Sequence, residues 1–441
     1  PGFIDINSEC DHSFGIFLEP YQENHIKQGV TTVIGGNRGI SLAPVSRAAL
    51  DFMRNWLGSF PVNVNWHSVK DFLRVLQKRG LGVNFGTVVG SATIRQSVVG
   101  DRNRDLTDNE IELCKNILSR SLDDGAFGFS DSGGEHFYET AVFAKIAAAK
   151  NRVYAANFKN IGEQILDSVG EKIKIAKETG VSIEINNFQP IKNSKKECEE
   201  FKDILEKEIA QTHVNFDCHP FEYLLLPIYD LLPSWMKGGG FKATIDYLNS
   251  PHLKKRLIEH FKKINFADFF IYRAPETFKA FTGKNLKDMS VYFNLKPTEA
   301  FLKLMKITNL RIFLIHKNVD VKTLHAFISS PNSIISGGGF DLFENGDFDA
   351  FPKFINWAGR SKNFPLEKAI AKITSAPAKK YNIRKRGLIK ENYYADIVVL
   401  RDFKPTEVLV NGQLALIEEK IQNILPGAVL KPMQKNAFPF S

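Results

Sequence analysis

The alternation of short apolar runs with amphipathic stretches constrains the fold of this chain more than any other feature. A capping box at Thr107–Glu110 and apolar residues at helical spacing over 161–179 predict helices between the runs. Repeated strand-helix units pack as a parallel sheet covered by helices, so the pattern predicts a (β/α)8 barrel, with one candidate strand more than the barrel needs. The candidate strands are 2–6, 31–34, 82–86, 126–130, 152–156, 182–185, 214–218, 311–315 and 333–336.

Two segments break this alternation. Residues 220–310 are rich in Leu, Phe and Lys and contain Gly238–Gly240 and Pro251, which predicts a mostly helical insertion over the barrel mouth. After Tyr381, short apolar runs separated by turn residues predict a small β lobe. We therefore expect a barrel over 1–382, with its insertion at about 220–310, and a β lobe over 383–441.

Composition and cysteine usage bear on where the protein works. Its 441 residues are 43% hydrophobic and 24% charged, and no apolar run approaches the ~20 residues of a membrane-spanning helix. The cysteines, at 10, 114, 198 and 218, lack paired spacing, so we expect buried thiols and a cytoplasmic protein. Because the chain begins at Pro1, we expect its natural N-terminus upstream, and the presence of a signal peptide stays open.

The net charge is +9, from 58 basic and 49 acidic residues. Such a charge attracts anions or nucleic acid. The lysines are spread along the chain, however, and no recognisable nucleic-acid module is present. We therefore expect a solvated, lysine-rich surface with no nucleic-acid and no membrane partner, and leave a partner protein or a homo-oligomer open.

Several ordered sequence blocks carry a resemblance to a known family. The first strand begins PGFID and alternates polar residues at positions 5, 7 and 9 with Ile4 and Ile6. The other blocks are QGVTT at 28–32, GNRGIS at 36–41, GSATIR at 90–95, DGAFGFS at 124–130, TSAPAKK at 374–380 and YADIVV at 394–399. Together they resemble the amidohydrolase superfamily, and within it the D-aminoacylase (N-acyl-D-amino-acid deacylase) family. The resemblance implies a barrel that hydrolyses N-acyl amides with metal-activated water. It also implies a β-sandwich lobe whose N-terminal stretch this chain lacks, so we expect exposed sheet edges there.

At the positions where the family holds its metal, this chain departs from the pattern. The resemblance places two histidine ligands at Asn7 and Glu9, a cysteine ligand at Arg38, and two further histidines at Asn157 and Asn187. Asparagine is a poor substitute for the imidazole that zinc prefers, and arginine brings a fixed positive charge. We expect no bound metal, and an ion pair between Arg38 and Glu9 in the former metal cavity.

The family's catalytic aspartate falls at Gly338, which has no side chain to move a proton. No catalytic residue is therefore assigned. Cys10 and His12 have a ligand-like spacing, but alternation along a strand would point them to the opposite face. The expected pocket-lining residues are Asp5, Asn7, Glu9, Arg38, Arg95, Asn157, Lys159, Asn187, His219 and Gly338. Lys159 is a candidate for binding a carboxylate or for simple solvation, and a lone His219 is more often structural than functional.

Three hypotheses remain. The first is a D-aminoacylase-like pseudoenzyme that has lost its metal and hydrolase activity, needs no cofactor, and binds a small molecule or regulates a partner. The second is an active amidohydrolase with zinc at a rebuilt site, acting on carbon-nitrogen bonds other than peptide bonds in N-acyl-D-amino acids or related amides. The third is a nucleic-acid-binding protein, which only the charge suggests.

Overall fold

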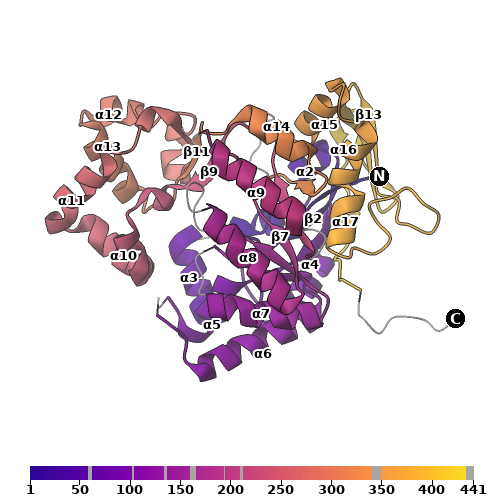
Figure 1. Cartoon of the computed structure of the whole chain (residues 1–441), viewed down its shortest axis with the longest axis horizontal. Coiled ribbons are helices and arrows are strands. Elements are labelled where there is room, and N and C mark those ends of the chain that lie inside the picture. Colours follow the sequence, from indigo (N-terminus) through magenta and orange to yellow (C-terminus); the bar gives the residue numbers. More distant parts are fainter. Residues whose placement is uncertain are drawn as a thin grey trace.

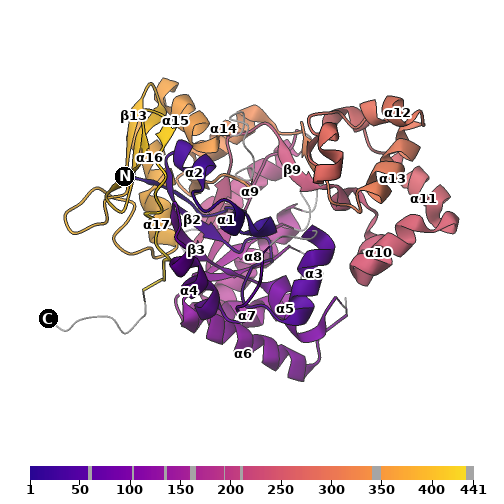
Figure 2. The same ribbon diagram turned by 180° about the vertical axis from the view of Figure 1, so that it is seen from behind.

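The computed structural model describes residues 1–433 except 58–61, 102–103, 134–136, 159–164, 193, 209–211 and 340–348. Its parallel strands form a barrel at the centre of the molecule (Figures 1 and 2). The barrel strands are β1 (Phe3–Asp5), β2 (Val30–Gly35), β3 (Asn84–Thr87), β4 (Val89–Gly90), β5 (Gly128–Ser130), β6 (Val153–Ala156), β7 (Ser182–Ile185), β8 (Val214–Cys218) and β12 (Ser333–Ile335). They pair in the orders β1-β2-β3 and β12-β8-β7-β6-β5-β4. Because β3 pairs with β2 before Val88 and β4 pairs with β5 after it, the two occupy one strand position. The predicted barrel is confirmed.

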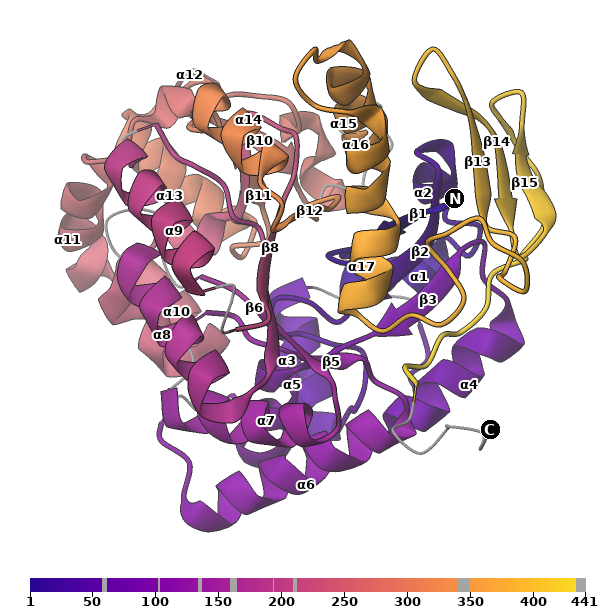
Figure 3. The ribbon, with the colours of Figure 1, turned by 45° about the vertical axis from the view of Figure 1, so that its right-hand side comes forward.

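Helices cover the outside of the barrel (Figure 3). In α6, Thr107 Oγ1 accepts from Glu110 N at 3.4 Å and Glu110 Oε2 accepts from Thr107 N at 2.8 Å, which is the predicted capping box. The helices are η1 (His12–Phe14), α1 (Gly15–Leu18), α2 (Glu23–Lys27), α3 (Arg47–Leu57), α4 (Val69–Arg79), α5 (Ser91–Val99), α6 (Asp108–Asp124), α7 (Phe137–Ala149), α8 (Ile165–Thr179), α9 (Lys195–Glu208), α14 (Val321–Ser329), α15 (Ala350–Arg360), α16 (Leu366–Ile373) and α17 (Ser375–Lys380).

Aromatic rings fill much of the space between strands and helices. Phe188 after β7 and Phe201 on α9 stack with their ring centroids 4.1 Å apart, and Phe216 and Phe327 pack against both. Burying one such ring contributes about 1.5–3 kcal/mol. This packing holds β7 and β8 in place, so the residues that follow them have fixed positions.

The insertion is a separate lobe with its own hydrophobic core. An antiparallel sheet in the order β10-β11-β9 supports it, formed by β9 (Leu224–Pro227), β10 (Phe269–Arg273) and β11 (Phe313–His316). The surplus strand predicted at 311–315 is therefore β11 of the insertion, which also extends beyond residue 310. Its helices are η2 (Ile228–Leu231), η3 (Ser234–Gly239), α10 (Gly240–Asn249), α11 (Pro251–Phe261), η4 (Phe266–Asp268), η5 (Glu276–Phe281), α12 (Asp288–Phe293) and α13 (Pro297–Ile307).

The insertion is anchored to the barrel beside α3. Arg311 Nη2 donates to the carbonyl of Asn55 at 2.9 Å, and Phe241 N donates to Asp101 Oδ2 at 2.8 Å. The ring of Trp56 on α3 meets Tyr229 edge to face at 4.6 Å. These contacts fix one side of the insertion, while α11 and α12 lie on its side away from the barrel (Figures 1 and 2).

The C-terminal β lobe is an antiparallel sheet of β13 (Ile397–Arg401), β14 (Lys404–Val410), β15 (Gln413–Ile417) and β16 (Lys420–Ile421). It stands beside α2 and the first barrel strands (Figure 3). A buried polar network centred on Asp396 joins it to the barrel. Asp396 Oδ2 accepts from Arg386 and from Asn84 Nδ2 of β3 at 3.1 Å, and Oδ1 accepts from Asn411 N at 2.8 Å. The domain boundary at 382/383 stays a prediction.

Two expectations from composition can be compared with the structure. The cysteines at positions 10, 114, 198 and 218 are buried and form no disulfide with one another, as predicted. Over the part of the chain that is described, no helix combines the length and the apolar character needed to cross a bilayer.

We predict that Asp396→Ala lowers the free energy of unfolding by about 3–5 kcal/mol, because it leaves Arg386 buried without its carboxylate. Urea denaturation measures the change. Glu23→Ala is the control, since it removes an exposed ion pair with Lys27 and should cost less than about 1 kcal/mol. Equal losses in the two variants would contradict a role for Asp396 in joining the lobe to the barrel.

Candidate functional site

Polar side chains that follow the barrel strands meet at their carboxyl ends, where barrel proteins place functional groups. They form two adjoining groups. The first surrounds Asp217 at the end of β8, and the second surrounds Glu9 in the segment after β1. Both groups are built from segments far apart in the sequence, so only the closed barrel brings them together.

Asp217 is buried and accepts hydrogen bonds from three strand ends. Ser336 Oγ donates to its Oδ1 at 2.5 Å, and the backbone N–H of Asn187 donates to the same oxygen at 3.2 Å. Asn7 Nδ2 lies 3.3 Å from Oδ1 and 3.4 Å from Oδ2. The predicted residues Asn7 and Asn187 thus meet around a carboxylate that sequence reasoning did not select.

Burial raises the pKa of Asp217 to about 6, and the hydrogen bonds from Ser336 and Asn7 limit the rise. A carboxyl with this pKa changes charge close to neutral pH. Its Oδ1 accepts from Ser336 and Asn187 and lies near Asn7, so the carboxylate holds the strand ends together. The available sequence signal was its place at the end of a predicted strand, two residues before His219.

Glu9 forms the predicted ion pair with Arg38. Arg38 Nε lies 2.5 Å from Glu9 Oε1, and the Glu9 side chain is 2% exposed while that of Arg38 is 25% exposed. On the other side, His12 Nδ1 lies 3.6 Å from Glu9 Oε2. Arg273 of β10 also interacts electrostatically with Glu9. Burial lowers the pKa of the Arg273 guanidinium, and the negative charge of Glu9 opposes that shift. Cationic side chains therefore face both oxygens of this buried carboxylate.

The position of His12 corrects the strand argument made for residues 9–12. β1 ends at Asp5 and His12 begins η1, so alternation between two faces does not extend that far. His12 consequently reaches Glu9, whereas Cys10 packs in the hydrophobic core. Burial alone would lower the pKa of His12, but the hydrogen bond and charge of Glu9, with the charge of Asp11, raise it to about 9. The imidazole is therefore cationic at neutral pH.

The glycines after β12 connect the two groups. Gly337 N donates to Asp5 Oδ1 at 3.1 Å, and the carbonyl of Gly338 accepts from Arg38 Nη2 at 3.5 Å. Gly338 and Gly339 have φ of +66° and +81°, a conformation that favours glycine. A Cβ at Gly338 would overlap the ring of His219.

His219 and Glu9 thus occupy the space beside these glycines. A Cβ at Gly339 would stand 2.6 Å from Glu9 Oε1. Burial lowers the pKa of His219 to about 3, and the charges of Arg38 and Lys353 add to this effect. His219 therefore lies beside Gly338 as a buried neutral ring.

The remaining predicted site residues divide into three cases. Asn157 contacts Asp131, the residue that follows β5. Its backbone N donates to Asp131 Oδ1 at 2.5 Å, and its side-chain Nδ2 donates to the Asp131 carbonyl at 2.7 Å. Arg95 lies on α5 and donates to both oxygens of Glu139 on α7, at 2.8 and 2.9 Å, among the outer helices. Lys159 lies outside the described residues.

The donor set near Arg38 does not fit a zinc ion. Glu9 is the carboxylate there, and both of its oxygens face cationic groups. Asn7 and Asn157 present neutral amides that are engaged by Asp217 and Asp131. Within the described ranges, no three His, Cys, Asp or Glu side chains gather so as to hold a metal ion. Catalytic zinc sites use three such ligands.

Comparisons with known proteins place this geometry in a family context. A protein-family profile described as "Amidohydrolase family" matches residues 250–415. The N-acyl-D-aspartate deacylase of Alcaligenes xylosoxydans xylosoxydans is 25% identical, over 100% of this chain and 86% of that protein. The D-aminoacylase of the same organism is also 25% identical, over 92% of this chain and 78% of that protein.

Solved structures agree on the fold. A D-aminoacylase with a binuclear metal centre superimposes with a TM-score of 0.79 at 22% identity, covering 98% of this chain and 88% of that chain. The N-acyl-D-glutamate deacylase of Bordetella bronchiseptica, complexed with zinc and a phosphonate inhibitor, gives a TM-score of 0.78 at 19% identity with the same coverage. The resemblance noted from the sequence is confirmed, and the two structures support the barrel fold.

We predict that Gly338→Ala lowers the free energy of unfolding by about 2–4 kcal/mol, through strain at positive φ and overlap with the His219 ring. In a His219→Ala background the same substitution should cost at least ~1 kcal/mol less, because the overlap is gone. Urea denaturation of the double-mutant cycle measures this coupling.

Gly283→Ala is the matched control for that cycle, since Gly283 has φ +82° with nothing within 4 Å of an added Cβ. It reports the backbone strain alone. A Gly338→Ala cost equal to that of Gly283→Ala, or no coupling to His219, would show that the histidine does not restrict position 338.

Proposed function

We propose that this D-aminoacylase-like member of the amidohydrolase family is a binding protein that does not carry out zinc-dependent hydrolysis. The observation that carries the proposal is the Arg38–Glu9 ion pair, which stands at two of the positions that the resemblance assigns to metal ligands.

Electrostatics argue against a cation at this position. A guanidinium stays protonated at every physiological pH. At about 4 Å and an effective dielectric constant of ~20, one unit charge repels a dication by roughly 8 kcal/mol. Glu9 cannot offset this repulsion, because Arg38 and His12 already engage it. Zinc affinity at this position is therefore expected to be negligible.

The neighbouring groups do not supply a base for water in another way. Gly338 has no side chain, and His219 is buried beside it with its pKa lowered to about 3. Asp217 has a suitable pKa of about 6, but its carboxylate is fully buried, and Ser336 and Asn187 donate to its Oδ1. A general base needs a free lone pair within hydrogen-bond reach of the water it activates.

The cationic side chains around Glu9 favour the binding of an anionic small molecule. Arg38, Arg273 and His12 bring positive charge to this end of the barrel. The relatives' names refer to N-acyl-D-aspartate and N-acyl-D-glutamate, which carry carboxylates. We therefore take an N-acylated acidic amino acid as the ligand class. A cytoplasmic location, suggested by four cysteines that form no disulfide with one another, is part of the proposal.

The second candidate is an active metal-dependent amidohydrolase that cleaves carbon-nitrogen bonds of N-acyl-D-amino acids or related amides. Similarity to two deacylases along almost the whole chain favours it. It requires zinc at a rebuilt site. Metal binding therefore separates the two candidates.

We predict that the protein, incubated with excess zinc and desalted, retains less than ~0.1 equivalent per chain, because Arg38 repels the cation. The double variant Asn7→His/Asn157→His should retain no more while Arg38 is present, and adding Arg38→Cys should raise retention. Elemental mass spectrometry measures the metal.

Asn249→His/Asn363→His, at exposed positions, controls for adventitious binding by added histidines. About one equivalent in the unaltered chain or in the double variant would favour the hydrolase.

We also predict that N-acetyl-D-glutamate binds without being hydrolysed, and that Arg273→Gln weakens binding about 10-fold, since a charge-assisted hydrogen bond contributes ~1.5 kcal/mol. Isothermal titration calorimetry measures the affinity, and NMR of the recovered ligand checks for cleavage. Arg256→Gln, on α11 with its guanidinium over Trp235, is the control. Release of acetate, or equal affinities for both variants, would contradict the proposal.

A further inference from the structure

The positive charge of this protein is concentrated in the insertion. Residues 224–316 contain 15 Lys and Arg against 7 Asp and Glu, a net charge of +8, which leaves +1 for the rest of the chain. Lysines are spread along the chain, as expected, but their excess over acidic residues lies mainly in the insertion. The barrel and β lobe are close to neutral, so any long-range attraction of polyanions acts through the insertion.

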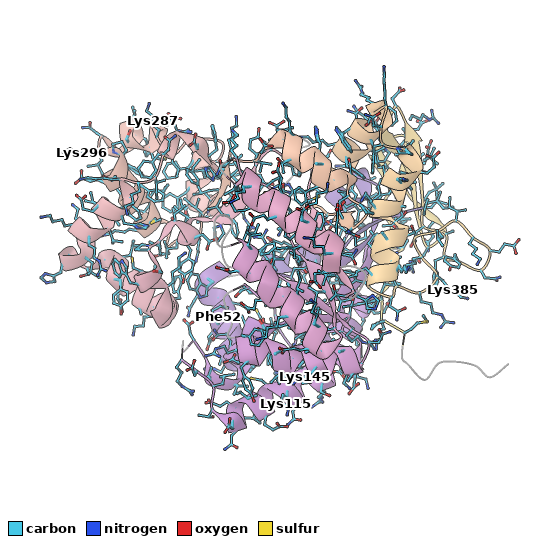
Figure 4. The ribbon with its side chains drawn as sticks, viewed as in Figure 1. Phe52, Lys115, Lys145, Lys287, Lys296 and Lys385 are labelled. Atoms are coloured by element: carbon cyan, nitrogen blue, oxygen red, sulfur yellow. The ribbon has the colours of Figure 1, made fainter. Side chains whose placement is uncertain are left out.

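Exposed apolar side chains lie at the outer end of the same lobe. Val291 is 82% exposed, Tyr292 61% and Leu295 38%. Figure 4 shows Lys287 and Lys296 at the outer margin of the insertion, beside α12. We call this surface the lysine tip, and its members are Lys284, Lys287, Val291, Tyr292, Leu295 and Lys296.

The lysine tip is held rigidly from beneath. Met289 of α12 and the nearby Leu286 are buried in the insertion's own core. The Tyr292 ring meets Phe281 edge to face at 5.2 Å, and Lys284 Nζ lies 5.4 Å from the centre of the same ring. The fold therefore keeps Val291 and Tyr292 in solvent on a fixed support, although burying them inside would be favourable.

We infer that the lysine tip binds the surface of a membrane rich in acidic lipids. Lysine ammonium groups are attracted to anionic headgroups, while Tyr and short aliphatic side chains enter the boundary between headgroups and acyl chains. Two of the acidic residues near the tip pair with lysines outside it, Glu276 with Lys279 and Glu299 with Lys254, while Asp288 begins α12.

The same residues favour lipid over nucleic acid. No arginine lies between Arg273 and Arg311, so the tip lacks the planar guanidinium that stacks on bases and grips phosphates in pairs. Val291 and Leu295 have no π face for stacking on a base. This inference departs from the expectation of no membrane partner, and it does not depend on whether the barrel binds a metal.

The full-length protein is tested by co-sedimentation with sucrose-loaded vesicles of phosphatidylcholine alone, or of phosphatidylcholine with about 30% phosphatidylserine as the acidic lipid. We expect binding at least ~10-fold stronger to the anionic vesicles, and weaker binding as salt rises. Lys287→Gln/Lys296→Gln should weaken it by roughly 5-fold per lysine. Val291→Ser/Leu295→Ser should weaken it while leaving the charge unchanged.

Lys145→Gln/Lys385→Gln is the matched control, because it removes the same charge from exposed lysines of the barrel helices and the segment before the β lobe (Figure 4). It should bind as strongly as the unaltered chain. Tyr292→Trp adds a direct report of insertion: the fluorescence of the introduced indole should shift to shorter wavelength with anionic vesicles and be quenched by brominated acyl chains.

Several outcomes would overturn the inference. They are no binding to anionic vesicles, equal losses in the tip and control variants, or binding of the Tyr292→Trp variant without any change in its fluorescence. Preferential binding to an oligonucleotide that the tip substitutions abolish would assign the surface to nucleic acid instead.

Discussion

The buried Glu9 carboxylate is the constraint on which the rest of the site depends. A carboxylate at 2% exposure must be paired, because an unpaired buried charge costs several kcal/mol. Arg38 after β2 and His12 in η1 supply the positive charge, and Gly339 leaves the room that Glu9 needs. The effect of a substitution at any one of these positions therefore depends on the others.

The sequence predicted the barrel well because its strands are buried on both faces. Such strands appear in the sequence as apolar runs separated by helical segments. The strands observed at the predicted barrel positions begin and end within about two residues of the predicted bounds. The same signal predicted β11 as a surplus strand without placing it, since an apolar run does not reveal whether it pairs with parallel or antiparallel neighbours. β9 and β10 were missed because they lie within a segment whose Leu and Phe content resembles a helix.

The sequence predicted the positions of site residues that lie at the ends of strands better than those of residues farther from a strand. Ordered sequence blocks located Asn7, Arg38, Asn187 and Gly338, and the structure brings these positions together. His12 was misjudged because strand periodicity was extended past Asp5, where β1 ends. Asp217 was missed because its importance lies in three hydrogen bonds from distant segments, and no local pattern records them.

The two proposals rest on different parts of the molecule and follow different physical rules. In the barrel mouth, charges are buried, so each must be balanced by a neighbour and little can change alone. On the insertion, the lysines are solvated and the core beneath them is separate, so exposed charge can accumulate at little cost in stability. This difference accounts for a nearly neutral barrel joined to a strongly basic insertion. The surface of the insertion and the interior of the barrel therefore respond to substitution independently, because the two sets of charges share no neighbours.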